Sequence, residues 1–357
     1  MQSGAHHSGG LSGVNDPGAS TRPDSLPPLA WPALLREAIR DVGELCRRLG
    51  LDPQEVAGAE GAVAEFPLLV TASFLSRMRP GDPRDPLLLQ VLPAAAELVA
   101  QPGFGDDPVG ELGCAAVPGL LRKYHGRALL VATAACAVHC RYCFRRHYPY
   151  ADGPRGRQWW DAALQHLAAD PSVSELILSG GDPLTLPDAQ LAALVTDAER
   201  NPALLRLRIH SRLPVVLPER VDAALCDWIA ATRLRVVVVI HANHPAEIDA
   251  TVVAACQRLQ RAGATVLNQA VLLAGINDSV EIQLALSEAL FAGGILPYYL
   301  HTLDPVRGAA HFAIPDARAV ALHQAVAARL PGYLVPRLVR EVPGATGKVP
   351  LTGPGDC

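Results

Sequence analysis

Short apolar runs, rich in β-branched residues, alternate with helical patterns from about residue 127 onwards. The centres of the last five runs recur about every 30 residues, the length of a strand with its crossover helix. Strands that are apolar throughout and alternate with helices are typical of a parallel sheet buried on both faces. The alternation therefore predicts an α/β fold, either an open partial barrel or a doubly wound sheet. The predicted strands are 128–133, 175–180, 205–211, 235–241, 265–273 and 295–301, with a seventh apolar run at 333–339 and helices at 161–170, 187–200, 247–263 and 316–330.

The chain before these strands has a different character. Its first residues are rich in Gly, Ser and Pro and lack periodicity, which predicts disorder. The following region has helical patterns, with one amphipathic helix predicted over 31–50, ending at Gly50, and an apolar pattern that resumes over 85–99. The predicted organisation is a disordered tail (1–30), an N-terminal helical region (31–115), a barrel (116–314) and a C-terminal segment (315–357).

Composition excludes several classes of function. The formal net charge is −4 and no basic block occurs, so we expect no nucleic-acid partner. The sequence contains no apolar run of about 18 residues and no secretory signal pattern, so we expect no membrane span. The eight cysteines are expected to stay reduced in the cytoplasm, where disulfides are rare, and the five scattered ones are interpreted as buried thiols.

Polar side chains follow the predicted strands one after another. In parallel α/β folds the chemistry lies at the C-terminal ends of the strands. Side chains that follow successive strands should therefore meet at one site. These side chains are the cysteines after the first strand, Ser179 to Asp182 after the second, His210 to Arg212 at the end of the third, His241 at the end of the fourth, Gln269 within the fifth, and His301 and Asp304 after the sixth.

Cys136, Cys140 and Cys143 form a C-x3-C-x2-C loop directly after the first strand. Three thiolates on a short loop can bind three irons of a cubane cluster and leave the fourth iron open for a ligand. The alternative is a zinc site, in which His139 or His147 would supply a fourth ligand. If the site binds zinc, the protein is expected to be a non-enzymatic zinc-binding protein.

Two glycine-rich segments add weaker signals. Gly180 and Gly181 follow a strand, where glycine allows the backbone to approach a ligand closely, although a tight turn alone also explains them. Lys348 lies in the loop GATGK after an apolar run. It is either an exposed lysine or one that binds pyridoxal phosphate (PLP) as a Schiff base.

Taken together, the chain resembles the lysine 2,3-aminomutases of the radical S-adenosylmethionine (SAM) superfamily. Within that family it resembles most the branch that supplies β-lysine for modification of elongation factor P. The resemblance runs from about residue 31 to 351. Its segments are VPGLLRKYHGRALL (117–130), CAVHCRYCFRRHYPYA (136–151), SGGDPL (179–184), LRIHSRLPVVLPER (207–220), LNQAVLL (267–273), LPYYLHTLDPVRGAAHF (296–312) and GYLVPRLVREVPGATGKVPL (332–351).

The resemblance implies a radical-SAM partial (β/α)6 TIM-like barrel, with an N-terminal helical region and a C-terminal segment that carries the PLP lysine. It implies three cofactors, namely a [4Fe–4S] cluster, SAM and PLP. The implied cluster ligands are Cys136, Cys140 and Cys143, and the implied SAM-binding residues are Tyr142, Ser179, Gly180, Gly181, Asp182 and His241. The implied PLP-binding residues are Tyr124, Arg212, Gln269 and the catalytic Lys348, and the implied substrate-binding residues are Arg145 for the carboxylate and Asp304 and Glu341 for the distal ammonium.

The implied reaction is an isomerisation, in which a SAM-derived radical lets the amino group of (S)-α-lysine move to give (R)-β-lysine. Its implied partners are L-lysine, an electron donor such as flavodoxin or ferredoxin, and elongation factor P with its lysine ligase. Two alternatives within the class stay open, because an acidic pair accepts any distal cation of suitable length. The substrate is then another cationic amino acid, such as ornithine or arginine, or a lysine already attached to protein.

Overall fold

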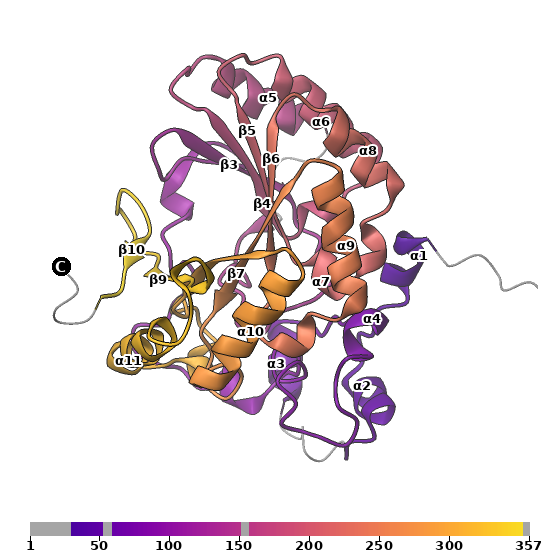
Figure 1. The fold of residues 1–357 in the computed structure, drawn as a ribbon, viewed down its shortest axis with the longest axis vertical. Coiled ribbons are helices and arrows are strands. Elements are labelled where there is room, and N and C mark those ends of the chain that lie inside the picture. The colour runs from indigo at the N-terminus through magenta and orange to yellow at the C-terminus, as the bar shows by residue number, and fades with distance from the viewer. Residues whose placement is uncertain (1–29, 53–58, 151–156, 353–357) are drawn as a thin grey trace, which may run out of the picture.

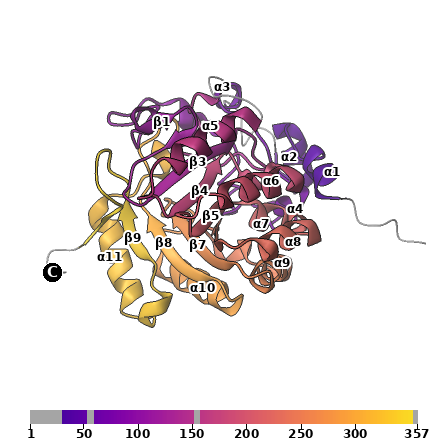
Figure 2. The same cartoon turned by 90° about the horizontal axis from the view of Figure 1, so that it is seen from above.

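The computed structural model describes residues 30–52, 59–150 and 157–352, and its described part contains one ten-stranded sheet (Figures 1 and 2). The spatial order of the strands follows the chain from β1 to β10. The predicted tail lies almost wholly outside the described residues. The strands are β1 (Ala115–Val117), β2 (Leu120–Leu121), β3 (Arg127–Thr133), β4 (Glu175–Gly180), β5 (Arg206–Ser211), β6 (Arg235–His241), β7 (Thr265–Val271), β8 (Leu296–His301), β9 (Arg337–Arg340) and β10 (Val349–Pro350).

The centre of the sheet is parallel. Each strand from β3 to β9 pairs in parallel with the next, and only the edge strands β1, β2 and β10 are antiparallel among the described elements. The six strands from β3 to β8 match the predicted strands within a few residues, and β4 and β6 are apolar over most of their length and largely buried. The fold is therefore mixed α/β with a largely parallel sheet.

Helices on the outer side of the sheet connect the parallel strands (Figure 2). Short polar side chains begin several of them: Asp222 accepts a bond from Leu225 N, and Asp249 accepts bonds from Thr251 N and Val252 N. Such N-caps satisfy backbone donors that have no partner within the helix. The helices are α5 (Arg157–Ala168), α6 (Asp188–Glu199), α8 (Ala223–Ala231), α9 (Ala250–Arg261), α10 (Val280–Ala292) and α11 (Asp316–Ala327), and the single turn α7 (Leu213–Val216) follows β5.

The N-terminal region differs from the prediction of one helix over 31–50. The structure has two helices, α1 (Trp31–Arg36) and α2 (Val42–Leu49), followed by the short α3 (Glu60–Glu65) and α4 (Ala72–Leu75). The helix is interrupted between α1 and α2 because Ile39 forms a β-bridge with Val70. Asp41 then caps α2, with its Oδ1 accepting a bond from Glu44 N at 2.7 Å. Gly50 does end α2 in the left-handed conformation, with φ of 67°.

The predicted apolar pattern at 85–99 forms no α-helix. Asp85 Oδ1 accepts bonds from Leu87 N (2.8 Å) and Leu88 N (3.0 Å), and the segment continues in turns. Leu87, Leu88 and Val91 are nevertheless fully buried. These turns carry Gln90 beneath the cysteine loop, where Gln90 O accepts a bond from Arg141 N at 2.9 Å.

The C-terminal segment returns to the sheet. Its strand β9 begins at Arg337, later than the predicted run at 333–339, because Pro331 starts a short 3-10 turn over Gly332–Leu334. The loop from Glu341 to Lys348 joins β9 to β10 and brings both of its ends to the C-terminal edge of the parallel strands. No helix in the described ranges is long and apolar enough to span a membrane.

Candidate active site

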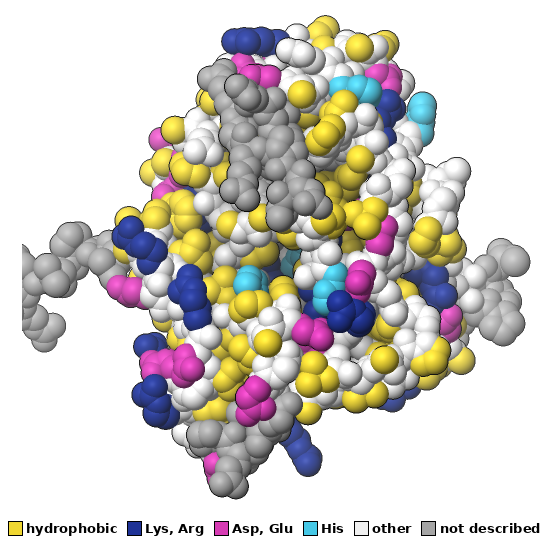
Figure 3. Space-filling view, turned by 180° about the vertical axis from the view of Figure 1, so that it is seen from behind, with side chains coloured by type: hydrophobic (Ala, Val, Ile, Leu, Met, Phe, Trp, Pro, Cys, Tyr) yellow, Lys and Arg dark blue, Asp and Glu magenta, His cyan; other side chains and the backbone are white. Residues whose placement is uncertain are grey.

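A cavity of about 370 Å³ lies at the C-terminal ends of the parallel strands, a size typical of small-molecule sites. On the face turned away from the viewer of Figure 1, histidine, acidic and basic side chains gather around a hollow (Figure 3). The structure brings all sixteen predicted site residues to the wall of this one cavity. They are Tyr124, Cys136, Cys140, Tyr142, Cys143, Arg145, Ser179, Gly180, Gly181, Asp182, Arg212, His241, Gln269, Asp304, Glu341 and Lys348.

The three cysteines of the loop lie together in the cavity wall, close enough for Cys140 to raise the pKa of Cys136 and of Cys143. Burial and, to a smaller extent, the neighbouring thiolates raise the pKa of Cys136 well above its ordinary value. Burial together with the charge of Cys140 raises the pKa of Cys143 to about 11. Three mutually repelling thiolates require bound cations to stay ionised together. A cubane cluster supplies that charge and binds each thiolate through a different iron, so this loop fits a [4Fe–4S] cluster.

The histidines proposed as zinc ligands have other partners. His139 Nδ1 lies 2.8 Å from the carbonyl oxygen of Pro67, and its ring stacks on Phe66 at 4.9 Å between centroids. His147 Nε2 lies 3.2 Å from the carbonyl oxygen of Arg307. Within the described part of the chain, no group of three or more His, Cys, Asp or Glu side chains is arranged to hold a single metal ion. The contacts of these two histidines therefore favour the cluster over zinc.

The glycine turn after β4 packs directly on the cysteine loop. Gly181 N donates to Thr133 O and Asp182 N donates to Ala135 O, both at 2.7 Å. A methyl group at Gly181 would lie 2.3 Å from Ala135 O, and Gly180 has a φ of 118°. Glycine is required at both positions, because backbone meets backbone there.

Asp182 is committed to contacts within the protein. Its carboxylate accepts bonds from Ser211 Oγ (2.7 Å), Arg212 N (2.7 Å), Leu213 N (3.1 Å) and Leu184 N (3.1 Å). Burial raises its pKa, and these four donors oppose that rise. In this structure Asp182 thus connects the end of β4 to the end of β5.

Arg145 forms a buried ion pair that the sequence did not reveal. Its Nε donates to Glu111 Oε2 at 2.6 Å and its Nη2 donates to Glu111 Oε1 at 2.7 Å, while Nη1 donates to Ser179 Oγ at 2.8 Å. Glu111 lies 34 residues before Arg145, and no local pattern marks it as buried. Only the Nη1 side of the guanidinium lacks a charged partner in the described residues.

Glu341 gathers the two lysines of the chain. Its Oε2 accepts a bond from Lys348 Nζ at 3.0 Å, and its Oε1 accepts bonds from Lys123 Nζ at 2.9 Å and from the Tyr124 hydroxyl. Burial raises the pKa of Glu341, but the charges of the two lysines and the Tyr124 hydrogen bond outweigh burial and lower it to about 2. The whole sequence contains only these two lysines, so a count of lysines would have identified Lys123 as a candidate site residue beside Lys348.

The remaining polar side chains leave groups that a ligand can satisfy. Burial raises the pKa of Asp304, the charge of Lys348 opposes that rise and the charge of Glu341 adds to it, with a net pKa of about 7. Burial lowers the pKa of His241 to about 3, so this imidazole is neutral, and its Nε2 lies 2.9 Å from Gln269 Nε2. Gln269 Oε1 and His301 Nε2 are buried without a hydrogen-bond partner in the described residues. Such orphaned polar atoms beside a lysine fit a polar cofactor such as PLP.

Arg212 lies at the base of the cysteine loop. Its Nη1 donates to Cys140 Sγ at 2.7 Å and to the Tyr142 hydroxyl at 2.8 Å. Burial lowers the pKa of Arg212, but the charges of Cys140, Tyr142 and Glu247 outweigh burial and raise it well above its ordinary value. The resemblance assigns this residue to PLP. In this structure its guanidinium contacts the cysteine loop, Gln90 and Glu247.

A loop suited to an iron–sulfur cluster and a lysine suited to PLP line the same cavity in this fold. The class that this arrangement defines is a cofactor-dependent enzyme built around an iron–sulfur cluster. Residues 125–205 match the model of a 4Fe-4S single cluster domain, which supports the same class.

Comparison with known proteins narrows the class to a family. The chain is 46% identical to L-lysine 2,3-aminomutase of Escherichia coli K12, over 90% of this chain and 94% of that protein. It is 45% identical to L-lysine 2,3-aminomutase of Haemophilus influenzae, over 89% of this chain and 94% of that protein. Among solved structures, a radical SAM methyltransferase from Sphaerobacter thermophilus matches with a TM-score of 0.42 and 19% identity, over 62% of this chain and 68% of that one.

The chain belongs to the lysine 2,3-aminomutase family. It is therefore a radical SAM isomerase, and the family's cofactors are a [4Fe–4S] cluster, SAM and PLP.

Proposed function

We propose that this enzyme converts L-lysine to (R)-β-lysine by moving the amino group from C2 to C3. One observation carries the proposal beyond family membership. Asp304, Glu341 and Arg145 line the same cavity as Lys348, and so two carboxylates and one guanidinium surround the predicted PLP site. A lysine molecule has complementary charges, because its carboxylate suits the guanidinium and its distal ammonium suits the carboxylates.

We assign the cofactors to different parts of the cavity wall. Cys136, Cys140 and Cys143 would hold the cluster in what we take to be the radical-SAM partial barrel (116–314). Ser179, Gly180, Gly181, Asp182, Tyr142 and His241 would line the SAM side. Lys348 of the C-terminal segment (315–357) would hold PLP, with Tyr124 and Gln269 beside it. When bound, the cluster and SAM supply the radical that activates a C–H bond of the substrate, and PLP stabilises the migrating amino group.

The protein's own contribution is orientation and charge. Glu111 binds Nε and Nη2 of Arg145, so the substrate carboxylate would meet the guanidinium at Nη1, in place of Ser179 Oγ. Lys348 Nζ now donates to Glu341 Oε2, and that oxygen becomes available for the substrate ammonium when Lys348 instead holds PLP.

The biological setting belongs to the same proposal. The resemblance to the branch that serves elongation factor P supports that factor and its lysine ligase as downstream partners. A flavodoxin or ferredoxin would supply the electron. Because the cluster thiolates must stay unoxidised, we place the enzyme in the reducing cytoplasm.

The direct test is anaerobic reconstitution with iron, sulfide and PLP, followed by incubation with SAM, dithionite and L-lysine. We expect β-lysine by mass spectrometry only when every component is present. Conversion of ornithine or arginine, or of lysine only when attached to protein, would replace the proposed substrate. A protein with verified cluster and PLP that converts none of them would refute the proposal.

A further inference from the structure

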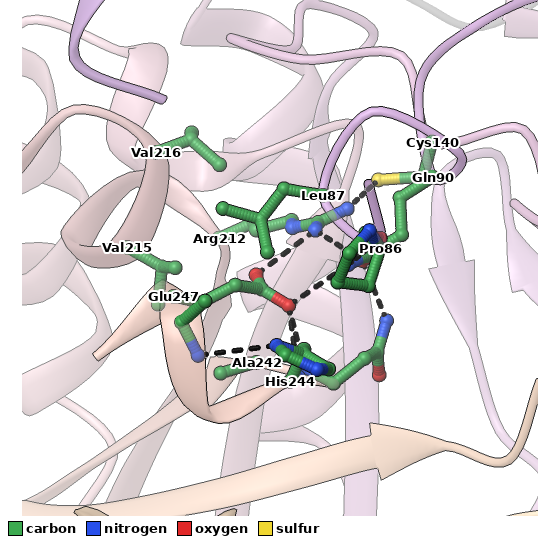
Figure 4. A network of polar contacts seen from close by, with 12 residues as sticks. Pro86, Leu87, Gln90, Cys140, Arg212, Val215, Val216, Ala242, His244 and Glu247 are labelled. Atoms are coloured by element: carbon green, nitrogen blue, oxygen red, sulfur yellow. Dashed lines mark hydrogen bonds and ion pairs between the residues drawn. The ribbon is translucent and has the colours of Figure 1, made fainter. Parts of the chain in front are cut away.

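The guanidinium of Arg212 lies between Cys140 of the cysteine loop and the buried carboxylate of Glu247 (Figure 4). One edge donates from Nη1 to Cys140 Sγ at 2.7 Å, and the other edge donates from Nη2 to Glu247 Oε2 at 3.1 Å. Arg212 is 5% exposed and Glu247 is fully buried. The guanidinium also lies 5.2 Å from the centroid of the Phe74 ring, so little water screens its charge.

Glu247 is held in place by several donors. Its Oε1 accepts bonds from Asn243 N (2.8 Å), His244 N (3.1 Å) and Gln90 Nε2 (3.0 Å). Gln90 Oε1 in turn accepts a bond from Arg212 Nη2 at 2.6 Å. Because Gln90 comes from the N-terminal region and Glu247 from the turn after β6, three distant segments together fix where the guanidinium points.

We propose that Arg212 is a positioning residue that raises the reduction potential of the cluster through Cys140, and that Glu247 holds its guanidinium and moderates its charge. The inference rests on the proposed function only in requiring that the three cysteines bind the cluster. Hydrogen bonds to cluster sulfurs and nearby charge are recognised determinants of cluster potential. A neighbouring cation stabilises the more negative, reduced state.

The redox step itself is simple. The [4Fe–4S]2+ cluster takes one electron from a low-potential donor and becomes [4Fe–4S]+, and the protein forms or breaks no bond in that step. Arg212 stays protonated throughout, since a guanidinium does not lose its proton in proteins. Its effect is therefore electrostatic and depends on the sign of the charge.

The two members of the pair predict shifts of opposite sign. Arg212→Met removes a cation and an N–H···S bond, so the midpoint potential should become more negative. Glu247→Gln removes an anion and leaves the guanidinium less neutralised, so the potential should become more positive. A role confined to packing would lower iron content or thermal stability in both variants without this opposition.

The experiment is a redox titration of the reconstituted full chain, with dithionite as reductant and the reduced cluster followed by electron paramagnetic resonance, without lysine. We expect Arg212→Met to shift the reduction equilibrium at least tenfold, about 59 mV for one electron, with Arg212→Lys closer to wild type. The matched control is Asp188→Asn, which removes a carboxylate from the buried Arg220 at 2.8 Å, outside the cavity. That variant should leave the potential unchanged.

The outcomes divide clearly. Opposite shifts in Arg212→Met and Glu247→Gln support the proposal, and shifts of the same sign, or none, overturn it. If Arg212→Met does not retain the cluster, Glu247→Gln decides alone, since a rise supports the proposal and a fall or no change overturns it. These readings need no turnover, so they stand apart from the β-lysine assay that tests the proposed function.

Discussion

Arg145 and Glu111 form a bidentate ion pair in the wall of the cavity, with N···O distances of 2.6 and 2.7 Å. Both side chains are buried, at 5% and 6% exposure. The pair keeps a guanidinium in the cavity wall without leaving a buried charge uncompensated. It also joins the N-terminal region to the loop that follows β3.

Glu111→Gln should destabilise the protein strongly. The substitution leaves the Arg145 guanidinium buried without its anion, and breaking a buried pair in this way costs about 3–5 kcal/mol. Chemical denaturation measures the loss. As a control, Glu281→Gln breaks an exposed pair with Arg329, whose members are 75% and 55% exposed, and should cost less than about 1 kcal/mol. Equal effects in the two variants would contradict the structural role of Glu111.

Gly181→Ala should prevent the cysteine loop from adopting its observed conformation. The added methyl group meets Ala135 O at 2.3 Å, and a backbone oxygen cannot turn aside as a side chain would. We expect a loss of at least about 1–3 kcal/mol of stability and reduced iron content after reconstitution. Gly332→Ala is the matched control, since nothing lies within 4 Å of its added methyl group. Normal iron content in Gly181→Ala would show that the loop does not need this close contact.

Lysine binding should strengthen as the pH rises through about 7. Burial raises the pKa of Asp304 to about 7, so its carboxylate is largely neutral below that pH and cannot attract an ammonium. The distal ammonium of lysine stays charged to about pH 10.4, so within this contact only the carboxylate changes its charge in this range. Affinity, measured from the PLP absorbance without SAM, should fall about tenfold per pH unit below 7. Asp304→Asn should bind weakly and with a shallower slope, and an equal slope in that variant would assign the titration elsewhere.

Lys348 should be the residue that binds PLP covalently. Borohydride reduction of the PLP-loaded protein, followed by peptide mapping, should place the label on Lys348 and not on Lys123. The two lysines lie at similar distances from Glu341, at 3.0 and 2.9 Å, so proximity to that carboxylate does not distinguish them. Lys348→Ala should lose the PLP absorbance and keep its iron. A label on Lys123 would reverse the assignment.

The parallel strands and the cysteine loop were predictable because their signals are local. Strands buried on both faces, such as β4 and β6, must be apolar along their length, and their predicted and observed bounds agree. The cysteine and glycine motifs likewise act within a few residues of chain. Arrival of these residues at one cavity followed from the rule that parallel strands end on the same edge.

Buried charges could not be predicted in this way. Glu247 begins the predicted helix 247–263 and reads as an ordinary first-turn acid, yet it is fully buried against Arg212, 35 residues away. Gln90 lies in a segment whose apolar pattern suggests a helix but which the structure folds as turns. Such residues are buried only because distant partners satisfy them, and no local pattern encodes those partners.

The central claim is that one cavity moves an amino group within a single lysine molecule. The most direct measurement incubates the complete system with an equal mixture of unlabelled L-lysine and L-lysine carrying 13C at every carbon and 15N at the α-nitrogen. Mass spectrometry of β-lysine should show only fully light and fully heavy product, because nitrogen and carbon stay together. Mixed product, with 15N on unlabelled carbon, or no β-lysine from a preparation with verified cluster and PLP, would contradict the account.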